Sequence, residues 1–325
     1  MDHRHRLWFL AHLILSYLYG VVLLTQASKS KPSNDQHNKF PKESSMTAQK
    51  KSMITEEFAR HVDSGLKQDT STTYNEVLQL RDDIWTYISN ELDFEEDFGC
   101  KDIESFSDLN GEHLGRMRNF TGAKDTPVDW VIHSDIGQPK NTFTNIHLTF
   151  WMKDCTDVPH LGMAFGTLPE AFYYIDIMPR YELVTNPEHC VKYYDDLNPV
   201  ALAHQSELFE QGVKPFHAAM PFIRASLSPC AVAGVGPLNF FQDCAKEKIW
   251  AVVKHWVELV KAAKVDTDQA ACDERRHRDY QQRKSIVYLD PANPIAERMV
   301  GKEAADRLVR ILAGEERNGA AYSHD

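Results

Sequence analysis

The feature that most constrains the fold is a set of four short segments near the middle of the chain. They are rich in β-branched and aromatic residues, and proline or glycine stands between them, which is typical of strands separated by turns. They cover residues 128–133, 146–152, 161–168 and 171–178. The sequence Leu168-Pro169-Glu170 joins the last two and predicts an antiparallel hairpin. No helical pattern lies between these segments, so they lack the rhythm of parallel βαβ units.

Helical periodicity is found on both sides of this centre. Residues 74–92 carry apolar residues at helical spacing, with Thr72 or Thr73 as the expected N-cap, and residues 240–263 form a second amphipathic run. Shorter helices are expected over residues 187–194, 199–209, 269–283, 295–300 and 303–312. We therefore expect a mixed α/β chain of the α+β type, an α/β/α sandwich whose mostly antiparallel central sheet is flanked by helices.

Two other regions give weaker signals. Glycine and aspartate are scattered between Leu92 and Asp125, which predicts irregular structure in this region. Residues 222–228 and 231–235 are expected to form a further pair of strands around Pro229.

The N-terminus has the pattern of a targeting segment. Basic residues precede an uncharged run from Leu7 to Leu24, and small residues follow near Ala27, which predicts a signal or signal anchor over residues 1–27. Polar residues within the run favour cleavage. No other stretch of the sequence is apolar enough to span a bilayer, so we expect membrane contact only through this segment if it is uncleaved.

Residues 28–53 are rich in lysine and serine and nearly free of aliphatic residues, which predicts a disordered basic leader. A signal followed by such a leader is typical of a two-part plastid address. A secreted protein with a loose N-terminus is the alternative. Residues 54–316 contain no internal repeat or linker and are expected to form a single domain, followed by a flexible tail at residues 317–325.

Composition and motifs exclude several classes of protein. The net charge of −11 argues against a surface that binds nucleic acid, while 42% apolar residues can form a sizeable core. The sequence Gly234-Val235-Gly236-Pro237 lacks the third glycine of a dinucleotide site. The six cysteines contain no C-x-x-C pair, so free thiols are favoured over disulfides and no metal site is predicted. Any redox chemistry therefore needs an external electron donor or a redox-active substrate.

Short stretches between Asp125 and Glu315, taken in order, carry a resemblance to a known family. They are Pro127-Val128-Asp129-Trp130-Val131, Thr156-Asp157-Val158-Pro159-His160, Ile175-Asp176-Ile177-Met178-Pro179-Arg180, Glu182-Leu183-Val184-Thr185-Asn186-Pro187, Tyr193-Tyr194-Asp195-Asp196, Phe222-Ile223-Arg224, Ser228-Pro229, Arg283-Lys284-Ser285-Ile286, Asp290-Pro291-Ala292 and Val300-Gly301-Lys302-Glu303. In this order the chain resembles the red chlorophyll catabolite reductases, which belong to the ferredoxin-dependent bilin reductase superfamily.

The resemblance implies a fold and an activity. It implies an antiparallel sheet flanked by helices, with no bound flavin, nicotinamide or metal. It also implies reduction of a linear tetrapyrrole, in chlorophyll catabolism or bilin metabolism, by single electrons from reduced ferredoxin and protons from acidic side chains. A non-catalytic protein that binds linear tetrapyrroles is the alternative.

Asp290 is the proton donor that the resemblance favours, although an aspartate before Pro291 is also typical of a turn or helix cap. Related reductases carry an acidic residue at the position of Ala164. Asp157, His160 or Asp176 could supply the missing proton, or the reaction could differ, or the protein could bind pigment without reducing it. The alternative for Asp176 is a solvent-facing strand residue.

Two kinds of basic residue complete the expected site. Arg224, expected on a strand, and secondly Arg180 could bind the carboxylates of a tetrapyrrole; either could instead be an exposed charge at a strand end. A basic run in the C-terminal part could dock an acidic ferredoxin, or could simply be a solvated helix surface. The docking candidates are Arg275, Arg276, Arg278 and Lys284.

Overall fold

The computed structural model describes residues 68–141, 144–167, 169–216, 218, 220–290 and 292–317, all within one compact unit. The expected signal segment and basic leader lie outside the described residues, as does all of the expected tail except Arg317. The domain limits at residues 54 and 316 stay predictions. In the described part of the chain, no helix is both long and apolar enough to cross a membrane.

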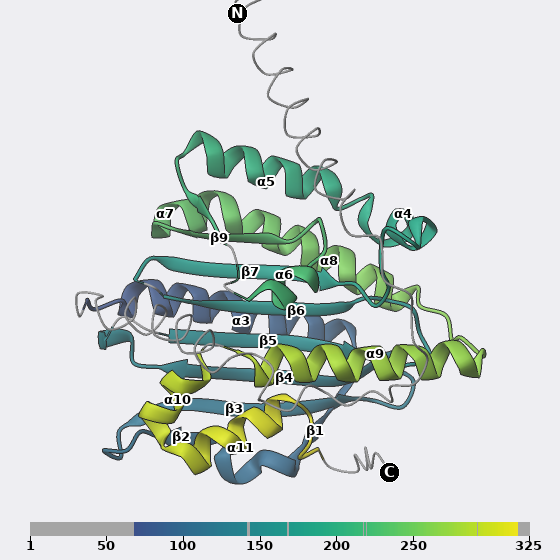
Figure 1. Ribbon diagram of the computed structural model, residues 1–325. Helices are drawn as coiled ribbons and strands as arrows, with labels where there is room; N and C mark the ends of the chain where they lie inside the picture. Colours follow the sequence, from purple (N-terminus) through teal and green to yellow (C-terminus); the bar gives the residue numbers. More distant parts are fainter. Residues whose placement is uncertain are drawn as a thin grey trace, which may run out of the picture. The chain divides into compact units, whose positions relative to one another are not determined.

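Nine strands among the described residues form one sheet in which every pair is antiparallel (Figure 1). Their order is β1-β3-β4-β5-β6-β7-β9-β8, with β2 paired to β3 outside this path. The bounds are β1 Phe94–Asp97, β2 Ser105–Ser107, β3 His113–Gly122, β4 Val128–Gly137, β5 Thr144–Met152, β6 His160–Thr167, β7 Ala171–Met178, β8 Lys214–Pro215 and β9 Val232–Gly236. The predicted antiparallel sheet and the hairpin between β6 and β7 are confirmed.

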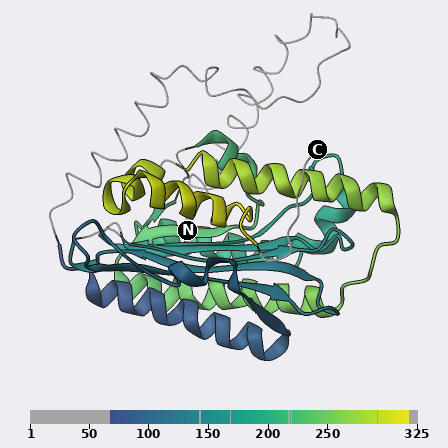
Figure 2. The same cartoon turned by 90° about the horizontal axis from the view of Figure 1, so that it is seen from below.

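Helices cover both faces of this sheet (Figure 2). One layer contains α3 Ser71–Glu91 and α8 Lys246–Lys261, and α5 Asn198–Glu210 packs beside α8. The short helix α7 Leu238–Phe240 and a π-helical turn at Phe241–Ala245 lead into α8. The other layer contains α6 Pro221–Ala225, α9 Gln269–Tyr288, α10 Asn293–Val300 and α11 Lys302–Leu312. Three short helices complete the fold: α4 Pro187–Tyr194, η1 Phe98–Ile103 and η2 Pro139–Asn141. The predicted α/β/α sandwich is confirmed.

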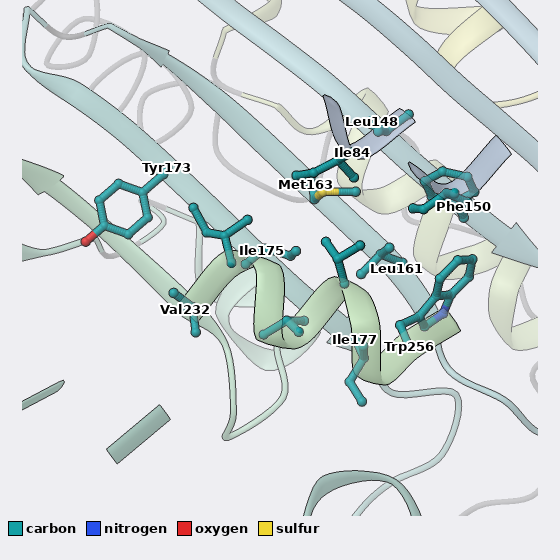
Figure 3. Packing of buried hydrophobic residues seen from close by; sticks show 14 of the residues in the cluster. Ile84, Leu148, Phe150, Leu161, Met163, Tyr173, Ile175, Ile177, Val232 and Trp256 are labelled. Atoms are coloured by element: carbon teal, nitrogen blue, oxygen red, sulfur yellow. The ribbon is translucent and has the colours of Figure 1, made fainter. Parts of the chain in front are cut away.

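The main core lies between the sheet and the layer of α3 and α8 (Figure 3). Alternate residues of β5, namely Ile146, Leu148 and Phe150, are fully buried on this side. The Trp256 ring on α8 packs on Phe150, and its indole N–H donates to the Pro159 carbonyl oxygen at 3.0 Å. Burying each large apolar side chain stabilises the fold by about 1.5–3 kcal/mol, so this face carries much of the folding free energy.

The opposite face of the sheet is covered less completely. Trp130 and Trp151 are register partners on β4 and β5, and they form a smaller cluster with Leu308 and Ile311 of α11. Farther along β5, β6 and β7 the helices stand away from the sheet and leave a cavity.

Two sequence expectations were wrong. The stretch before Asp125 was expected to be irregular, but it forms β1, β2 and β3. These strands lie toward one edge of the sheet and expose many polar side chains, so their sequences lack the apolar pattern of the central strands. Residues 222–228 form no strand: Pro221 occupies the first turn of α6, and this short helix places Arg224 on a helix. The first helix also begins slightly earlier than expected, at Ser71 after Thr70.

Candidate functional site

A cavity of about 330 Å³ separates the sheet from α6, α9 and α10. Its sheet wall comes mainly from the faces of β5, β6 and β7 that point away from the main core. Its helix wall comes from α6, the end of α9 and the start of α10. Most of the lining side chains are apolar, including Trp151, Phe172, Met178, Phe216 and Ile286. A largely apolar cavity with a few polar groups is the usual form of a small-molecule site.

Three lining residues form a row across the sheet wall. Ala164 on β6 pairs with His147 on β5 and with Tyr174 on β7, so the three side chains share one face. Burial, with a smaller contribution from the charge of Arg81, lowers the pKa of His147 to about 4. His147 is therefore neutral near pH 7, and the alanine between it and Tyr174 contributes only a methyl group.

Asp290 lies on the helix wall, in the turn between α9 and α10. Its Oδ1 accepts a hydrogen bond of 2.8 Å from the backbone N–H of Ala292. Burial raises the pKa of Asp290, and the Ala292 hydrogen bond offsets only part of this effect. The carboxyl group thus has the local contact of a turn aspartate and also faces the cavity.

Asp176 lies on β7 two residues after Tyr174, on the same face of the sheet but beside the cavity. It is 1% exposed and does not line the cavity. Its carboxylate accepts hydrogen bonds from the backbone N–H of Ser228 at 2.7 Å and from the Ser228 hydroxyl at 2.5 Å. The Tyr174 hydroxyl lies nearby. Burial raises the pKa of Asp176 to about 6 despite these bonds. The expectation of a solvent-facing residue is wrong for Asp176.

Three other expected site residues lie outside the cavity. Asp157 binds Lys192 at 2.7 Å and the Tyr193 hydroxyl at 2.6 Å, so it ties α4 to the loop before β6. His160 and Arg180 are fully buried and both contact Asp279 on α9. These partners bind the polar atoms of all three side chains, and their action on substrate stays a prediction.

The buried group around Asp279 has a consistent hydrogen-bonding pattern. His160 accepts at Nδ1 from the Met152 N–H at 2.9 Å, so its Nε2 carries the proton that faces Asp279, also at 2.9 Å. Arg180 binds both carboxylate oxygens of Asp279, and one of its nitrogens also donates to the backbone carbonyl oxygens of residues 153, 156 and 158. This network holds α9 on the sheet.

Arg224 is exposed on α6, between residues that line the cavity. One of its guanidinium nitrogens donates to the carbonyl oxygen of Ala218, which is itself a lining residue. Arg224 therefore lies at the rim of the cavity, where a bound molecule with a carboxylate could reach it.

The expected docking residues on α9 do not share one environment. Arg275 is 2% exposed and donates to Tyr181, Asp266 and the Asp154 carbonyl oxygen, so it presents no charge to a partner and that expectation is corrected. Arg276 is exposed but pairs with Asp154 and Asp273. Arg278 is half-buried, and Lys284 pairs with Glu315 at 3.5 Å.

Among the residues that the structure describes, no three His, Cys, Asp or Glu side chains are placed to hold a metal ion. All six cysteines are free, and three of them are buried.

Comparison with known proteins decides the family. A family model described as red chlorophyll catabolite reductase (RCC reductase) matches residues 79–314. This chain belongs to the red chlorophyll catabolite reductase family. The matched range contains every strand and every cavity-lining residue in the described part of the chain.

Relatives within the RCC reductase family are distant. The chain is 21% identical over 212 residues to red chlorophyll catabolite reductase 1, chloroplastic, of Oryza sativa subsp. japonica, covering 61% of this chain and 64% of the rice protein. It is 25% identical over 197 residues to the Hordeum vulgare enzyme, covering 56% and 94%. It is 22% identical over 228 residues to the chloroplastic enzyme of Arabidopsis thaliana, covering 65% and 70%.

A solved structure shares the fold. Phytochromobilin synthase from tomato, determined in complex with biliverdin, superposes with a TM-score of 0.62 at 14% sequence identity. The match covers 75% of this chain and 85% of the tomato chain.

Sequence reasoning missed His147 and Tyr174 as cavity residues. The signal was the alternation within β5 and β7, where polar residues occur between the apolar residues that point toward α3 and α8. Alternation predicts two faces, but it does not show that one face borders a cavity instead of solvent.

Proposed function

We propose that this member of the RCC reductase family reduces an open-chain tetrapyrrole bound in the cavity between the sheet and α6, α9 and α10. The observation that carries the proposal is the position of Asp290, a carboxyl group of raised pKa in a largely apolar wall. Family membership and the fold shared with a biliverdin complex support it. The volume of about 330 Å³ lies within the usual range of small-molecule sites.

The electrons in this proposal come singly from reduced ferredoxin, and no cofactor is bound. Each electron added to the conjugated pigment increases its basicity, so a nearby acid can then transfer a proton. Asp290 is suited to this step because burial favours its neutral form. A carboxylate of the pigment would extend to the rim and bind Arg224.

Ferredoxin would dock along α9, which carries Arg276, Arg278 and Lys284. Two of these cations have acidic partners within the chain, so we expect docking to be weak and sensitive to salt.

We further propose that residues 1–53 direct the protein to a plastid, in line with the chloroplastic rice and Arabidopsis relatives. A reporter fused to residues 1–55 should accumulate in plastids. Secretion of the reporter into the medium would support the secretory alternative.

The assay that tests the function uses the purified chain, reduced ferredoxin and a panel of linear tetrapyrroles without oxygen. We expect ferredoxin-dependent loss of the long-wavelength absorption of at least one pigment. Binding without this loss would support the alternative, a tetrapyrrole-binding protein, which Ala164 in the sheet wall favours. Omitting ferredoxin while keeping its reducing system gives the control.

A further inference from the structure

Titratable side chains of different kinds lie on the two walls of the cavity. Among the described residues that line it, Asp290, His147 and Tyr174 are the ones with titratable side chains. Asp290 lies on the helix wall, whereas His147 and Tyr174 lie on the sheet wall. A flat pigment between the walls would therefore meet Asp290 from one side and the other two from the opposite side.

Neither sheet-wall residue is an effective acid by itself. His147 is neutral near pH 7 and has no readily released proton, because burial lowers its pKa to about 4. Burial also raises the pKa of Tyr174 well above its ordinary value, with a smaller contribution from Asp176. The Tyr174 hydroxyl can release its proton only if its oxygen receives another one.

Asp176 is placed to supply that proton. It lies two residues after Tyr174 on β7, so both side chains are on the same face of the strand. The Tyr174 hydroxyl lies close enough to the Asp176 carboxyl group for each to affect the pKa of the other. Asp176 itself is 1% exposed and does not line the cavity.

We propose that Asp176 delivers a proton to the bound pigment through the Tyr174 hydroxyl. This inference rests on the proposed function and adds a second proton route, on the wall opposite Asp290. Tyr174 would contact the pigment, and Asp176 would act through it as a positioning residue.

The step balances in protons and electrons. A two-electron reduction uses two electrons from ferredoxin and two protons, of which Asp290 supplies one. For the other, the Tyr174 O–H bond breaks as its proton joins the reduced pigment, and the Asp176 carboxyl proton moves to the Tyr174 oxygen. Tyr174 ends neutral and Asp176 ends as a carboxylate, which the hydrogen bonds from Ser228 stabilise.

The surroundings of Asp176 suit a group that changes protonation. Burial raises its pKa to about 6, so part of the population is protonated near neutral pH. Among the described residues, the titratable side chains that face it are Tyr174, Tyr194 and Cys230, and burial raises the pKa of each of them, so they stay neutral.

Two substitutions test the relay. Tyr174→Phe keeps the ring and removes the hydroxyl, and Asp176→Asn keeps an acceptor for Ser228 and removes the acid. We expect each to lower single-turnover reduction about 100-fold. We expect pigment affinity, measured by absorbance titration, to stay within about threefold. The double variant should be no slower than either single variant, since both act on one route.

A proton-specific readout separates the relay from a structural role. In both variants the electron still arrives, so the one-electron-reduced pigment should accumulate and be visible by absorption and electron paramagnetic resonance. Tyr173→Phe is the matched control, because Tyr173 is the neighbour on β7 whose hydroxyl points into the core toward His204 at 3.3 Å. It should reduce pigment at the wild-type rate.

The outcomes distinguish this inference from the function on which it rests. Wild-type turnover for Tyr174→Phe, or additive losses in the double variant, would overturn the relay alone. A wild-type protein that reduces no pigment would overturn the proposed function as well. If Asp176→Asn fails to fold, the result for Tyr174→Phe alone decides whether the relay operates. The Tyr174 hydroxyl forms no part of the main core, so this variant should fold.

Discussion

At the scale of single residues, the site depends on where carboxyl groups lie relative to water. Asp290 and Asp279 are both shielded, yet their pKa values move in opposite directions. Asp290 meets a single backbone N–H, so burial prevails and the neutral acid is favoured. Burial would also raise the pKa of Asp279, but His160 and Arg180 outweigh it and keep that group ionised. Asp290 can therefore donate a proton, whereas Asp279 helps to hold α9 on the sheet.

Replacing Asp290 tests its role as an acid. Asp290→Asn keeps the size and the hydrogen bond to Ala292 but removes the transferable proton, so we expect turnover to fall about 100-fold or more with pigment affinity nearly unchanged. Steady-state rates and absorbance titrations measure the two effects. Because only the protonated form donates, the wild-type rate should fall as pH rises through the raised pKa. Unchanged turnover in the variant would remove Asp290 from the mechanism.

At the scale of elements, α9 shows where sequence reasoning succeeds and where it fails. Its existence and approximate start were predictable, but its very polar sequence was interpreted as a solvated or docking surface. The buried residues Cys272, Arg275, Asp279 and Arg283 instead form the face that lies on the sheet. Charged groups can occupy such a face when partners elsewhere in the chain satisfy them, and those partners are far away in sequence.

The same limit explains the other errors. The central strands were predictable because their pattern is local and strongly apolar. The edge strands β1 and β2 and their neighbour β3 are partly polar, so their pairing with distant residues had to be seen in the structure. Asp290 was found through family resemblance, whereas the contact of Tyr174 with the cavity depends on where the helices stand.

The attachment of α9 gives a stability prediction. Asp279→Asn leaves the buried Arg180 without its counter-charge, so we expect the free energy of unfolding at pH 7 to fall by about 3–5 kcal/mol in urea denaturation. Because the folded-state pKa of Asp279 is lowered, its contribution is complete above the unfolded pKa of about 4 and is lost as pH falls below it. The difference between wild type and variant should therefore narrow below about pH 4.

Asp273→Asn is the matched control on the same helix, since Asp273 is exposed and pairs with Arg276 at the surface. It should change the free energy of unfolding by less than about 0.5 kcal/mol. Equal losses for both variants would contradict the special role of the buried network.

At the scale of the whole molecule, the chain is acidic, with a net charge of −11, and its proposed electron donor is acidic too. Association must therefore depend on a local surface, and the exposed cations of α9 are our proposal for it. Such an encounter is governed by electrostatics that salt screens over about 10 Å at 0.1 M ionic strength.

Charge reversal tests the docking surface. Arg276→Glu should raise the KM for ferredoxin about tenfold at low salt, with little change in kcat once ferredoxin is saturating. Lys261→Glu is the matched control, because Lys261 is also a helix cation with an acidic partner three residues earlier, but it lies on α8 in the opposite layer. Equal effects of the two substitutions would show that ferredoxin responds only to the overall charge.

The alternation along β5 has a consequence for how the family can vary. Ile146, Leu148 and Phe150 hold the strand against α3 and α8, whereas His147, Thr149 and Trp151 border the cavity. Substitutions at the second set can alter the lining of the cavity while leaving the main core intact. Inserting one residue into the strand would exchange the two sets and place an imidazole in the core. The lengths of these strands should therefore tolerate change only in steps of two residues.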